Sequence, residues 1–402
     1  AKRKEEPPSG ELRLSNSFDD LRLEDLHRLH SAKWGHYPGD VIAAWVAEMD
    51  FPVAEPVRQA IIAAAERSDF GYPSSMEHTN FAEVVSGWAD RSYGWKVDPE
   101  SILILPDVVK ALHVGVVTLS EPGDGVVIQP PVYPPFFMVI KENDRRVVEN
   151  PMVFRGGRYE LDLEGLDAAM EGAKLFILCN PQNPTGRCFR REELEAVAEL
   201  AIRHDVFVIS DEVHSPLTLP GSKHTVFAML GDDVAKRTLT VTAASKAWNF
   251  GGLKCGFAVA GSQEMAGKLK GLGHLATGGA SILGIEATVA ALTEGGPWID
   301  RVTDYLDDNR RLLGSLLAEH LPEVVYTMPE ATYLTWLDCR ALDLKPDPYT
   351  FFLEEAKVAF SNGPNFGTQG EGFVRFNFAT SRAIVTEIVH RMAAAVNRSR
   401  EG

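Results

Sequence analysis

Cysteine is scarce and positive charge is in deficit in this sequence of 402 residues. The 40 Lys and Arg residues stand against 56 Asp and Glu residues, a formal net charge of −16 that argues against nucleic acid or an anionic membrane as the main partner. A local basic pocket for a small anion stays open. The cysteines form no C-x-x-C pair, so neither a disulfide framework nor a metal site is signalled, and a reducing, cytoplasmic setting is expected. They are Cys179, Cys188, Cys255 and Cys339.

Long apolar runs are missing as well. No stretch reaches the roughly 18 residues that a membrane-spanning helix needs, and residues 1–10 lack the apolar core of a signal peptide. Their charge and their Pro and Gly content predict a flexible lead-in, which we place at residues 1–30. Because the chain begins at Ala1 without an initiator Met, a processed product and a domain cut from a longer protein both stay open.

Short apolar, β-branched runs alternate with helix-like segments through the middle of the chain. Between the third and fourth runs, residues 192–204 carry apolar residues at helical spacing. This alternation predicts an α/β fold with a mostly parallel sheet, in which ligands bind at the carboxyl ends of the strands. The predicted strands are residues 102–105, 125–128, 175–178, 206–209 and 239–242.

The pattern changes after about Pro297. A long amphipathic helix is predicted at residues 298–320, followed by short strands and a last helix at 383–396. We therefore expect a second, smaller α+β domain. The predicted division assigns residues 57–297 to the large domain, and residues 31–56 and 298–402 to the small one.

Polar clusters follow three of the five predicted strands. Asn183 lies in N-P-Q-N-P-T-G after the third strand, Asp211 in S-D-E-V-H after the fourth, and Lys246 in S-K-A-W-N after the fifth. Taken singly, each has an ordinary explanation: a tight turn, a solvated acidic turn and a surface lysine. Their order and spacing favour a functional explanation instead.

The functional explanation is a site for pyridoxal 5'-phosphate. Asp211 would keep the pyridine nitrogen protonated so that the ring accepts electrons, a role in which Glu212 is not required. Asn183, held between two prolines, would present its amide to the ring hydroxyl. Lys246 has small and aromatic neighbours at a strand end, where partial desolvation lowers the pKa of an amine and makes it a nucleophile.

These motifs resemble the fold-type I pyridoxal-phosphate enzymes of the aspartate aminotransferase superfamily, over nearly all of the chain from about Lys33. Within it, the sequence is most similar to the MalY/PatB-type C–S lyases, or cystathionine β-lyases. The similarity lies in W-V-A-E-M-D-F at residues 45–51, in P-P-V-Y-P-P-F at 130–136, and in His214, where typical aminotransferases have Tyr. The resemblance implies a large domain with a mostly parallel seven-stranded sheet, plus the smaller α+β domain.

The resemblance also implies roles for single residues around the cofactor. Lys246 is the catalytic lysine that carries the cofactor as a Schiff base, and Asp211 and Asn183 keep the roles given above. His214 joins the cofactor contacts. Tyr133 would stack on the ring and border the substrate, although an aromatic residue in a Pro-rich loop can also simply pack on the core.

The cofactor phosphate has its own set of expected contacts. Backbone N–H groups of Val108 and Val109, at a helix N-terminus, and the hydroxyl of Ser245 would receive it. Tyr72 resembles the residue that reaches the phosphate from the neighbouring subunit, which implies a homodimer with shared active sites.

Two lysines depart from the family pattern at the phosphate. Lys254 stands where aminotransferases have an Arg, and so keeps a cation without the bidentate fork. Lys110 stands where many relatives have Pro. Each could be a phosphate ligand, a substrate contact or an exposed charge, and we place Lys254 among the cofactor contacts.

The resemblance assigns Arg375 to the α-carboxylate of an amino-acid substrate, because a planar fork matches a planar anion. The alternative is a strand Arg paired with a surface acid. Arg382 is expected only to cap or brace the site. Residues around Tyr133, with 273–279 and 361–367, are expected to shape the side-chain pocket.

The expected reaction is α,β-elimination. Lys246 removes the α-proton, a thiolate or persulfide leaves Cβ, and pyruvate and ammonia follow. Cysteine S-conjugates and cystathionine are the favoured substrates. The alternatives are an aminotransferase on the same fold and, with less support, a regulatory protein or a lyase domain of a larger biosynthetic assembly.

Overall fold

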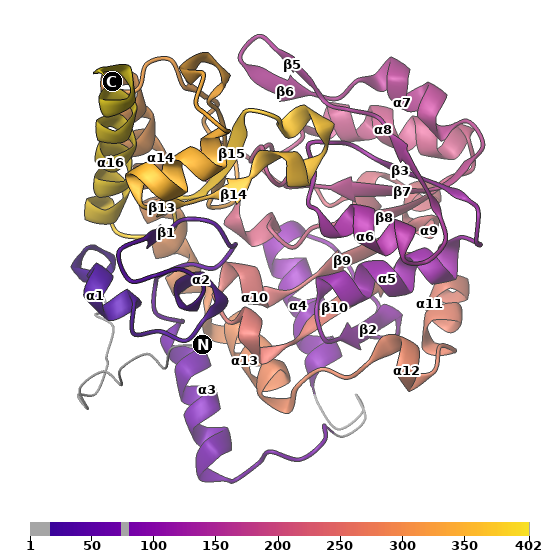
Figure 1. Ribbon diagram of the computed structural model, residues 1–402. Coiled ribbons are helices and arrows are strands. Elements are labelled where there is room, and N and C mark those ends of the chain that lie inside the picture. Colours follow the sequence, from indigo (N-terminus) through magenta and orange to yellow (C-terminus); the bar gives the residue numbers. More distant parts are fainter. Residues whose placement is uncertain (1–16, 74–79, 402) are drawn as a thin grey trace.

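The computed structural model describes residues 17–73 and 80–401, and a seven-stranded sheet lies at its centre (Figure 1). The strands run in the order β2-β10-β9-β8-β7-β3-β4. From β9 to β4 all neighbours are parallel, whereas β10 is antiparallel to both β9 and β2. The bounds are β2 Ile102–Leu105, β3 Gly125–Ile128, β4 Arg146–Glu149, β7 Ala173–Cys179, β8 Phe207–Asp211, β9 Thr238–Thr242 and β10 Gly256–Ala260. The predicted α/β class and the mostly parallel sheet are confirmed.

Helices cover both faces of this sheet, so alternate residues of one strand enter different cores. Ile209 packs with α5 and α6 on one face, whereas Val208 packs with α7 and α8 on the other. On α5, a Cβ at Gly115 would lie 2.7 Å from the Ile209 side chain, so only glycine allows this close approach. The covering helices are α5 Val108–Leu119, α6 Pro135–Lys141, α7 Leu163–Met170, α8 Arg191–Arg203, α9 Asp232–Lys236 and α11 Gln263–Lys270.

A second, antiparallel sheet has the order β11-β12-β15-β14 and lies beside two long helices (Figure 1). The helices are α14 Gly296–His320 and α16 Arg382–Glu401, close to the two that the apolar pattern predicts. The strands are β11 Val325–Tyr326, β12 Leu334–Asp338, β14 Ser361–Asn362 and β15 Phe373–Asn377. This sheet fits the proposed small domain, whose boundaries stay a prediction.

The N-terminal segment joins the C-terminal part of the chain. Strand β1 Ile42–Ala43 pairs in parallel with β13 Val358–Ala359. Helices α3 and α4 pack on α13, next to the large sheet. The remaining elements are α1 Leu23–Leu26, α2 Ala32–Gly35, α3 Glu55–Glu66, α4 Phe81–Tyr93, α10 Ala244–Ala247, α12 His274–Thr277, α13 Ile282–Glu294, α15 Pro348–Phe351 and the hairpin of β5 Val153–Arg155 with β6 Arg158–Glu160.

The prediction of a flexible lead-in over residues 1–30 is wrong for its second half. Phe18 and Leu26 are buried, and the Phe18 ring lies 4.3 Å from that of Phe51 between centroids. Asp19 accepts hydrogen bonds from Tyr305 and Arg382. Widely spaced apolar anchors in a polar segment hold residues 17–30 on the fold, while residues 1–16 lie outside the described part.

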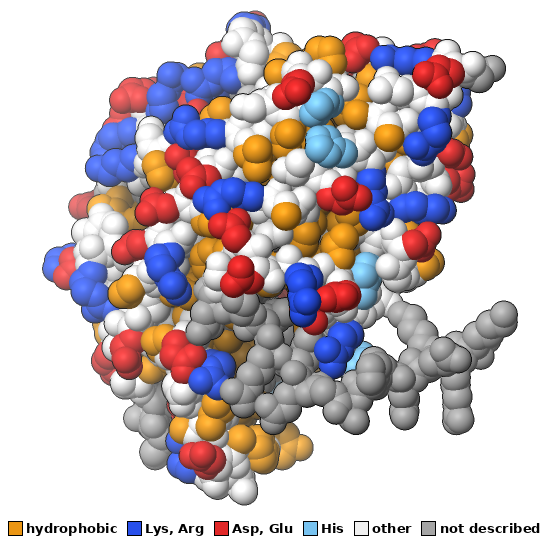
Figure 2. Space-filling view, turned by 90° about the vertical axis from the view of Figure 1, so that its left-hand side faces the viewer, with side chains coloured by type: hydrophobic (Ala, Val, Ile, Leu, Met, Phe, Trp, Pro, Cys, Tyr) orange, Lys and Arg blue, Asp and Glu red, His pale blue; other side chains and the backbone are white. Residues whose placement is uncertain are grey.

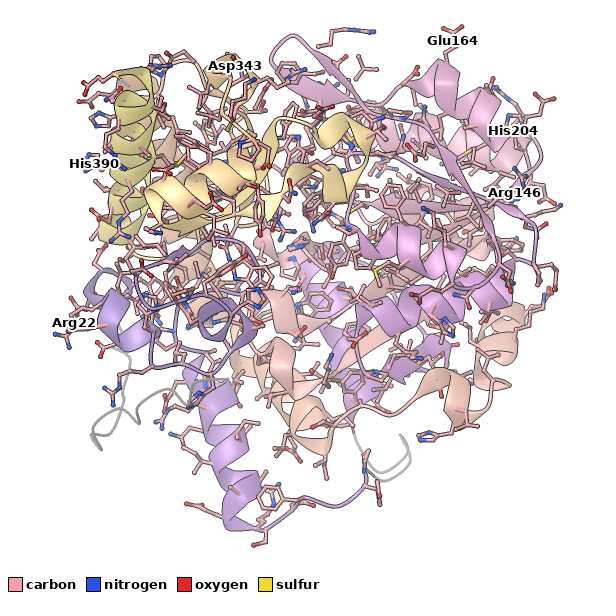
Figure 3. The ribbon with its side chains drawn as sticks, in the orientation of Figure 1. Arg22, Arg146, Glu164, His204, Asp343 and His390 are labelled. Carbon is pink, nitrogen blue, oxygen red and sulfur yellow. The ribbon has the colours of Figure 1, made fainter. Side chains whose placement is uncertain are left out.

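Acidic and basic side chains are interspersed over the face shown in Figure 2. Side chains such as Arg146 and His204 point away from the molecule at its edge (Figure 3), and His204 contacts Asp167 of α7 at 2.6 Å. Within residues 17–73 and 80–401, no helix is both long and apolar enough to cross a membrane.

Candidate active site

The three predicted polar clusters meet at the carboxyl edge of the large sheet. Cys179 at the end of β7 pairs in register with Asp211 at the end of β8, and Asp211 pairs with Val241 of β9. The loops that follow therefore emerge side by side, and they carry Asn183 and Lys246. All the predicted cofactor contacts except Tyr72 line one cavity, together with Ala47, Asp107, Cys179, Val213 and Gly251. Arg375, Arg382, Lys110 and the stretches 273–279 and 361–367 are not part of this lining.

Lys246 lies at the wall of this cavity, in the short helix α10. Burial, and next the cation of Arg375, lower the pKa of its amine to about 8. Its Nζ donates a hydrogen bond to the carbonyl oxygen of Ala47 at 2.9 Å. An appreciable fraction of this amine is neutral near pH 7, as a nucleophile and proton acceptor requires.

Asp211 is only 4% exposed, and its carboxylate faces the same cavity. Burial raises its pKa to about 7, and the N–H of Val213, which donates to Oδ1 at 3.1 Å, opposes that rise. A buried carboxyl in this state would be stabilised as the anion by a protonated ring nitrogen, so it fits the pyridine of the cofactor.

His214 is buried and neutral. Burial, and then the charges of Lys246 and Arg375, lower its pKa to about 3. Its Nδ1 is buried without a hydrogen-bond partner in the described part of the chain, and its ring meets that of Tyr333 edge-on at 6.0 Å. A buried ring nitrogen without a partner is rare in native proteins, and beside this cavity it points to a ligand contact.

Arg375 on β15 is 5% exposed and its partners are neutral groups. One guanidinium nitrogen donates to Asn183 Oδ1 at 3.1 Å, and another donates to Trp45 O at 2.7 Å and Ser361 Oγ at 2.9 Å. Burial lowers its pKa to about 10. The pairing with a surface acid is therefore not what the structure shows. A buried cation among neutral partners is suited to receive an anion from a ligand.

Residues 45–51 reach the cavity wall at Ala47, and side-chain amides fix their backbone. Asn249 Nδ2 donates to Met49 O at 3.0 Å and Phe51 O at 2.8 Å, and its Oδ1 accepts from Met49 N. Asn377 Nδ2 donates to Val46 O and Glu48 O. The Asn of S-K-x-x-N therefore fixes the backbone of residues 49–51, a role that the motif alone does not indicate.

A buried ion pair supports the same segment from behind. Lys33 Nζ lies 2.8 Å from Asp50 Oδ1 and also donates to Glu48 O, and Trp34 Nε1 donates to Asp50. Both charged side chains are 1% exposed. Removing one partner would leave a buried charge, so the pair resists local rearrangement.

The end of the cavity at which we expect the cofactor phosphate lies at the N-terminus of α5. Val108 and Val109 open the helix, and Asp107 caps it by accepting a hydrogen bond from Lys110 N at 2.9 Å. Lys254 pairs with the second oxygen of Asp107 at 3.0 Å. We did not predict Asp107 as a site residue, although an Asp directly before the first residue of a helix is a recognisable N-cap signal.

Three further predicted residues occupy different surroundings. Tyr133 is half-buried on the cavity wall, next to Phe136 at 6.2 Å between ring centroids. Tyr72 is fully exposed and lies away from the cavity of its own chain. Arg382 forms ion pairs with Asp19 and Asp308, which makes it a brace of the N-terminal segment.

Known proteins are similar to this chain over almost its whole length. Residues 35–392 match the family of class I and II aminotransferases. Cystathionine beta-lyase PatB of Bacillus subtilis is 38% identical over 95% of this chain and 100% of its own, and cystathionine beta-lyase of Corynebacterium glutamicum is 34% identical over 93% and 99%. The crystal structure of cystalysin from Treponema denticola, which contains pyridoxal 5'-phosphate, superposes with a TM-score of 0.90 at 27% identity, over 96% of this chain and 100% of that one.

The family, the cofactor and the fold-type I architecture inferred from the motifs are thereby confirmed. The chain belongs to the class I and II aminotransferases and is a pyridoxal-phosphate-dependent enzyme.

Proposed function

We propose that this enzyme is a C–S lyase that eliminates a thiol, or a persulfide, from cysteine S-conjugates or cystathionine-like amino acids. The observation that carries the proposal is His214, buried and neutral between the charges of Lys246 and Arg375, where typical aminotransferases have a tyrosine. The names of the relatives from Bacillus subtilis and Corynebacterium glutamicum, both cystathionine beta-lyases, support the same reaction.

The cavity fits the cofactor in its donors and in its charges. Lys246 would attach it covalently, Asp211 would meet the ring nitrogen, and Asn183 and His214 would meet the polar edge of the ring. Tyr133 would cover a ring face. The remaining contacts would be to the phosphate, from the N–H groups of Val108 and Val109, the hydroxyl of Ser245 and the ammonium of Lys254. The bound cofactor supplies an acceptor for the electron pair that is released at Cα of the substrate.

The chain's own residues account for substrate binding and proton transfer. Arg375 binds the α-carboxylate and so fixes the direction of the Cα–H bond. The amine of Lys246, freed when the substrate amine replaces it, takes the α-proton. The Cβ–S bond then breaks, sulfur leaves with the electron pair and is protonated, and one water completes hydrolysis to pyruvate and ammonia.

Product analysis tests this function directly. The protein, loaded with pyridoxal phosphate, is incubated with a panel of cysteine conjugates while pyruvate and free thiol are measured. Equal amounts of the two are expected, and Lys246→Ala should abolish both. Glutamate-dependent exchange of keto acids without thiol release would overturn elimination and would make the protein an aminotransferase.

A homodimer belongs to the same proposal. Tyr72 and Leu275 are almost fully exposed and Phe70 is 62% exposed, which is unusual for large apolar side chains. A second copy would cover them, and Tyr72 would reach the phosphate in the partner's cavity.

A further inference from the structure

We propose that Asp107 is an anion built into the phosphate end of the site, which competes with the cofactor phosphate for Lys254 and for the N-terminus of α5 and so weakens cofactor binding. The proposal rests on the placement of the phosphate given above. It concerns a residue to which the family resemblance assigns no role.

Backbone pairing brings the two side chains together. Leu105, the last residue of β2, pairs with Gly256, the first of antiparallel β10, so Asp107 and Lys254 each lie two residues beyond one paired position. A Cβ at Gly256 would lie only 3.0 Å from the carbonyl carbon of Asp107, a tight contact that shows how closely β10 approaches the Asp107 backbone. The position of the Asp107 backbone is therefore set by the sheet.

Lys254 is held in place by its own backbone. It has φ 57° and ψ 72°, a left-handed conformation that lysine rarely adopts. Its carbonyl accepts from Ser281 N at 3.0 Å, and its Nζ reaches Asp107 Oδ2 at 3.0 Å. The cation therefore stands at the cavity wall, already engaged by a carboxylate.

Asp107 also occupies the helix terminus itself. Its Oδ1 takes the Lys110 N–H, and its negative charge lies at the positive end of the 12-residue helix α5. Burial alone would raise its pKa, but the Lys110 N–H and the Lys254 ammonium together hold that pKa below the ordinary value. Near neutral pH the carboxylate of Asp107 is therefore negatively charged. It lies beside both groups that would attract a phosphate dianion, the N-terminus of α5 and the ammonium of Lys254.

A second observation, independent of helix α5, indicates that the cavity binds a ligand. His214 Nδ1, which is buried and has no partner within the described chain, belongs to another wall of the same cavity. The contacts to the cofactor ring do not involve Asp107. Its effect is accordingly confined to the phosphate group, and that separation makes it measurable.

Asp107→Asn is the discriminating variant, because Asn caps a helix about as well as Asp but has no charge. We expect the dissociation constant of pyridoxal phosphate from the apoprotein, measured by fluorescence quenching, to fall about 10-fold. A larger effect is not expected, because solvent screens the charges of Asp107 and Lys254, whose side chains are about half exposed. The affinity for pyridoxal, which lacks the phosphate, should not change. Thermal unfolding of the apoprotein should stay within a few degrees of wild type.

A double-mutant cycle tests the competition for Lys254. Lys254→Met should weaken pyridoxal phosphate binding, and by a larger factor in the Asp107→Asn background, where Lys254 is free to meet the phosphate. An unchanged or weaker affinity in Asp107→Asn overturns the proposal, as does an equal change for pyridoxal. If wild type binds no pyridoxal phosphate at all, the proposed function fails before this question arises.

Discussion

At the scale of single residues, the site is a set of groups that burial moves away from their ordinary protonation states. Lys246 and Arg375 have lowered pKa values and Asp211 a raised one, so each charged form is disfavoured until a partner arrives. A ligand with a cationic ring nitrogen and a carboxylate would supply partners for two of them. The site is thus matched in charge to a cofactor together with an amino acid.

The pKa of Lys246 predicts how cofactor attachment depends on pH. The neutral amine is the nucleophile, so the rate of covalent attachment to the apoprotein should rise with pH through a midpoint near 8. Arg375→Gln removes a cation that lowers this pKa, and should therefore move the midpoint upward. Absorbance at stepped pH measures it. The matched control is Arg382→Gln at the exposed brace, which should leave the midpoint where it is.

Asp211 predicts a change in the stability of the apoprotein. Its folded pKa of about 7 lies above its ordinary value, so its stabilising contribution is present at low pH and is lost as pH rises through 7. Asp211→Asn should therefore make the apoprotein more stable than wild type at pH 8, by on the order of 4 kcal/mol, and about equally stable at pH 4. Denaturant titrations of the variant and the wild type at pH 4 and pH 8 test this prediction. A variant that is less stable than wild type at pH 8 would contradict it.

At the scale of elements, the segment 45–51 depends on side chains from both sheets. Asn249, after β9 of the large sheet, and Asn377, on β15 of the small one, hold its backbone. Tyr333 and Lys246 both donate to the carbonyl of Ala47. The segment therefore contributes to the cavity wall through Ala47, although it lies about 200 positions from Lys246 in the chain.

Asn249→Gly isolates this support, since Asn249 has φ 61° and glycine adopts that conformation freely. Loss of three hydrogen bonds should cost about 2–3 kcal/mol of stability and speed amide hydrogen exchange in residues 45–51. Asn249→Asp keeps the acceptor for Met49 N but sets a carboxylate oxygen against the carbonyl oxygens of Met49 and Phe51, so we expect it to be at least as destabilised as the glycine variant. Unchanged exchange in both variants would show that the segment is held by other contacts.

Prediction from the sequence succeeded where local pattern decides structure. The five predicted strands match β2, β3, β7, β8 and β9 closely, because each is a compact apolar run. The strands β4 and β10 were not predicted. The strand β4 lies at the edge of the sheet and has charged residues at both ends, and β10 follows closely after the S-K-A-W-N motif, which was interpreted only for its chemistry. Ala47 was missed as a site residue because contacts between distant parts of the chain bring it to the cavity, whereas the N-cap position of Asp107, directly before Val108, could have been recognised.

At the scale of the whole molecule, the exposed apolar side chains predict a dimer. Leu275 belongs to α12 and Tyr72 to the chain after α3, and both of these segments lie in the lower part of Figure 1. Leu275→Asp should shift the sedimentation of the protein toward the monomer, because burying a carboxylate in an apolar interface is costly. The control is Leu163→Asp, next to Glu164 at the opposite edge (Figure 3). A wild-type monomer at micromolar concentration would contradict the shared site.

The pairing of β1 with β13 ties residues 42–43 to the C-terminal part of the chain, a few residues before the segment that Asn249 holds near the large sheet. The carbonyl of Ala47, which accepts a hydrogen bond from Lys246, lies on the stretch between these two attachments. A movement of the β1–β13 pair relative to the large sheet would therefore strain the hydrogen bond that holds the amine of Lys246.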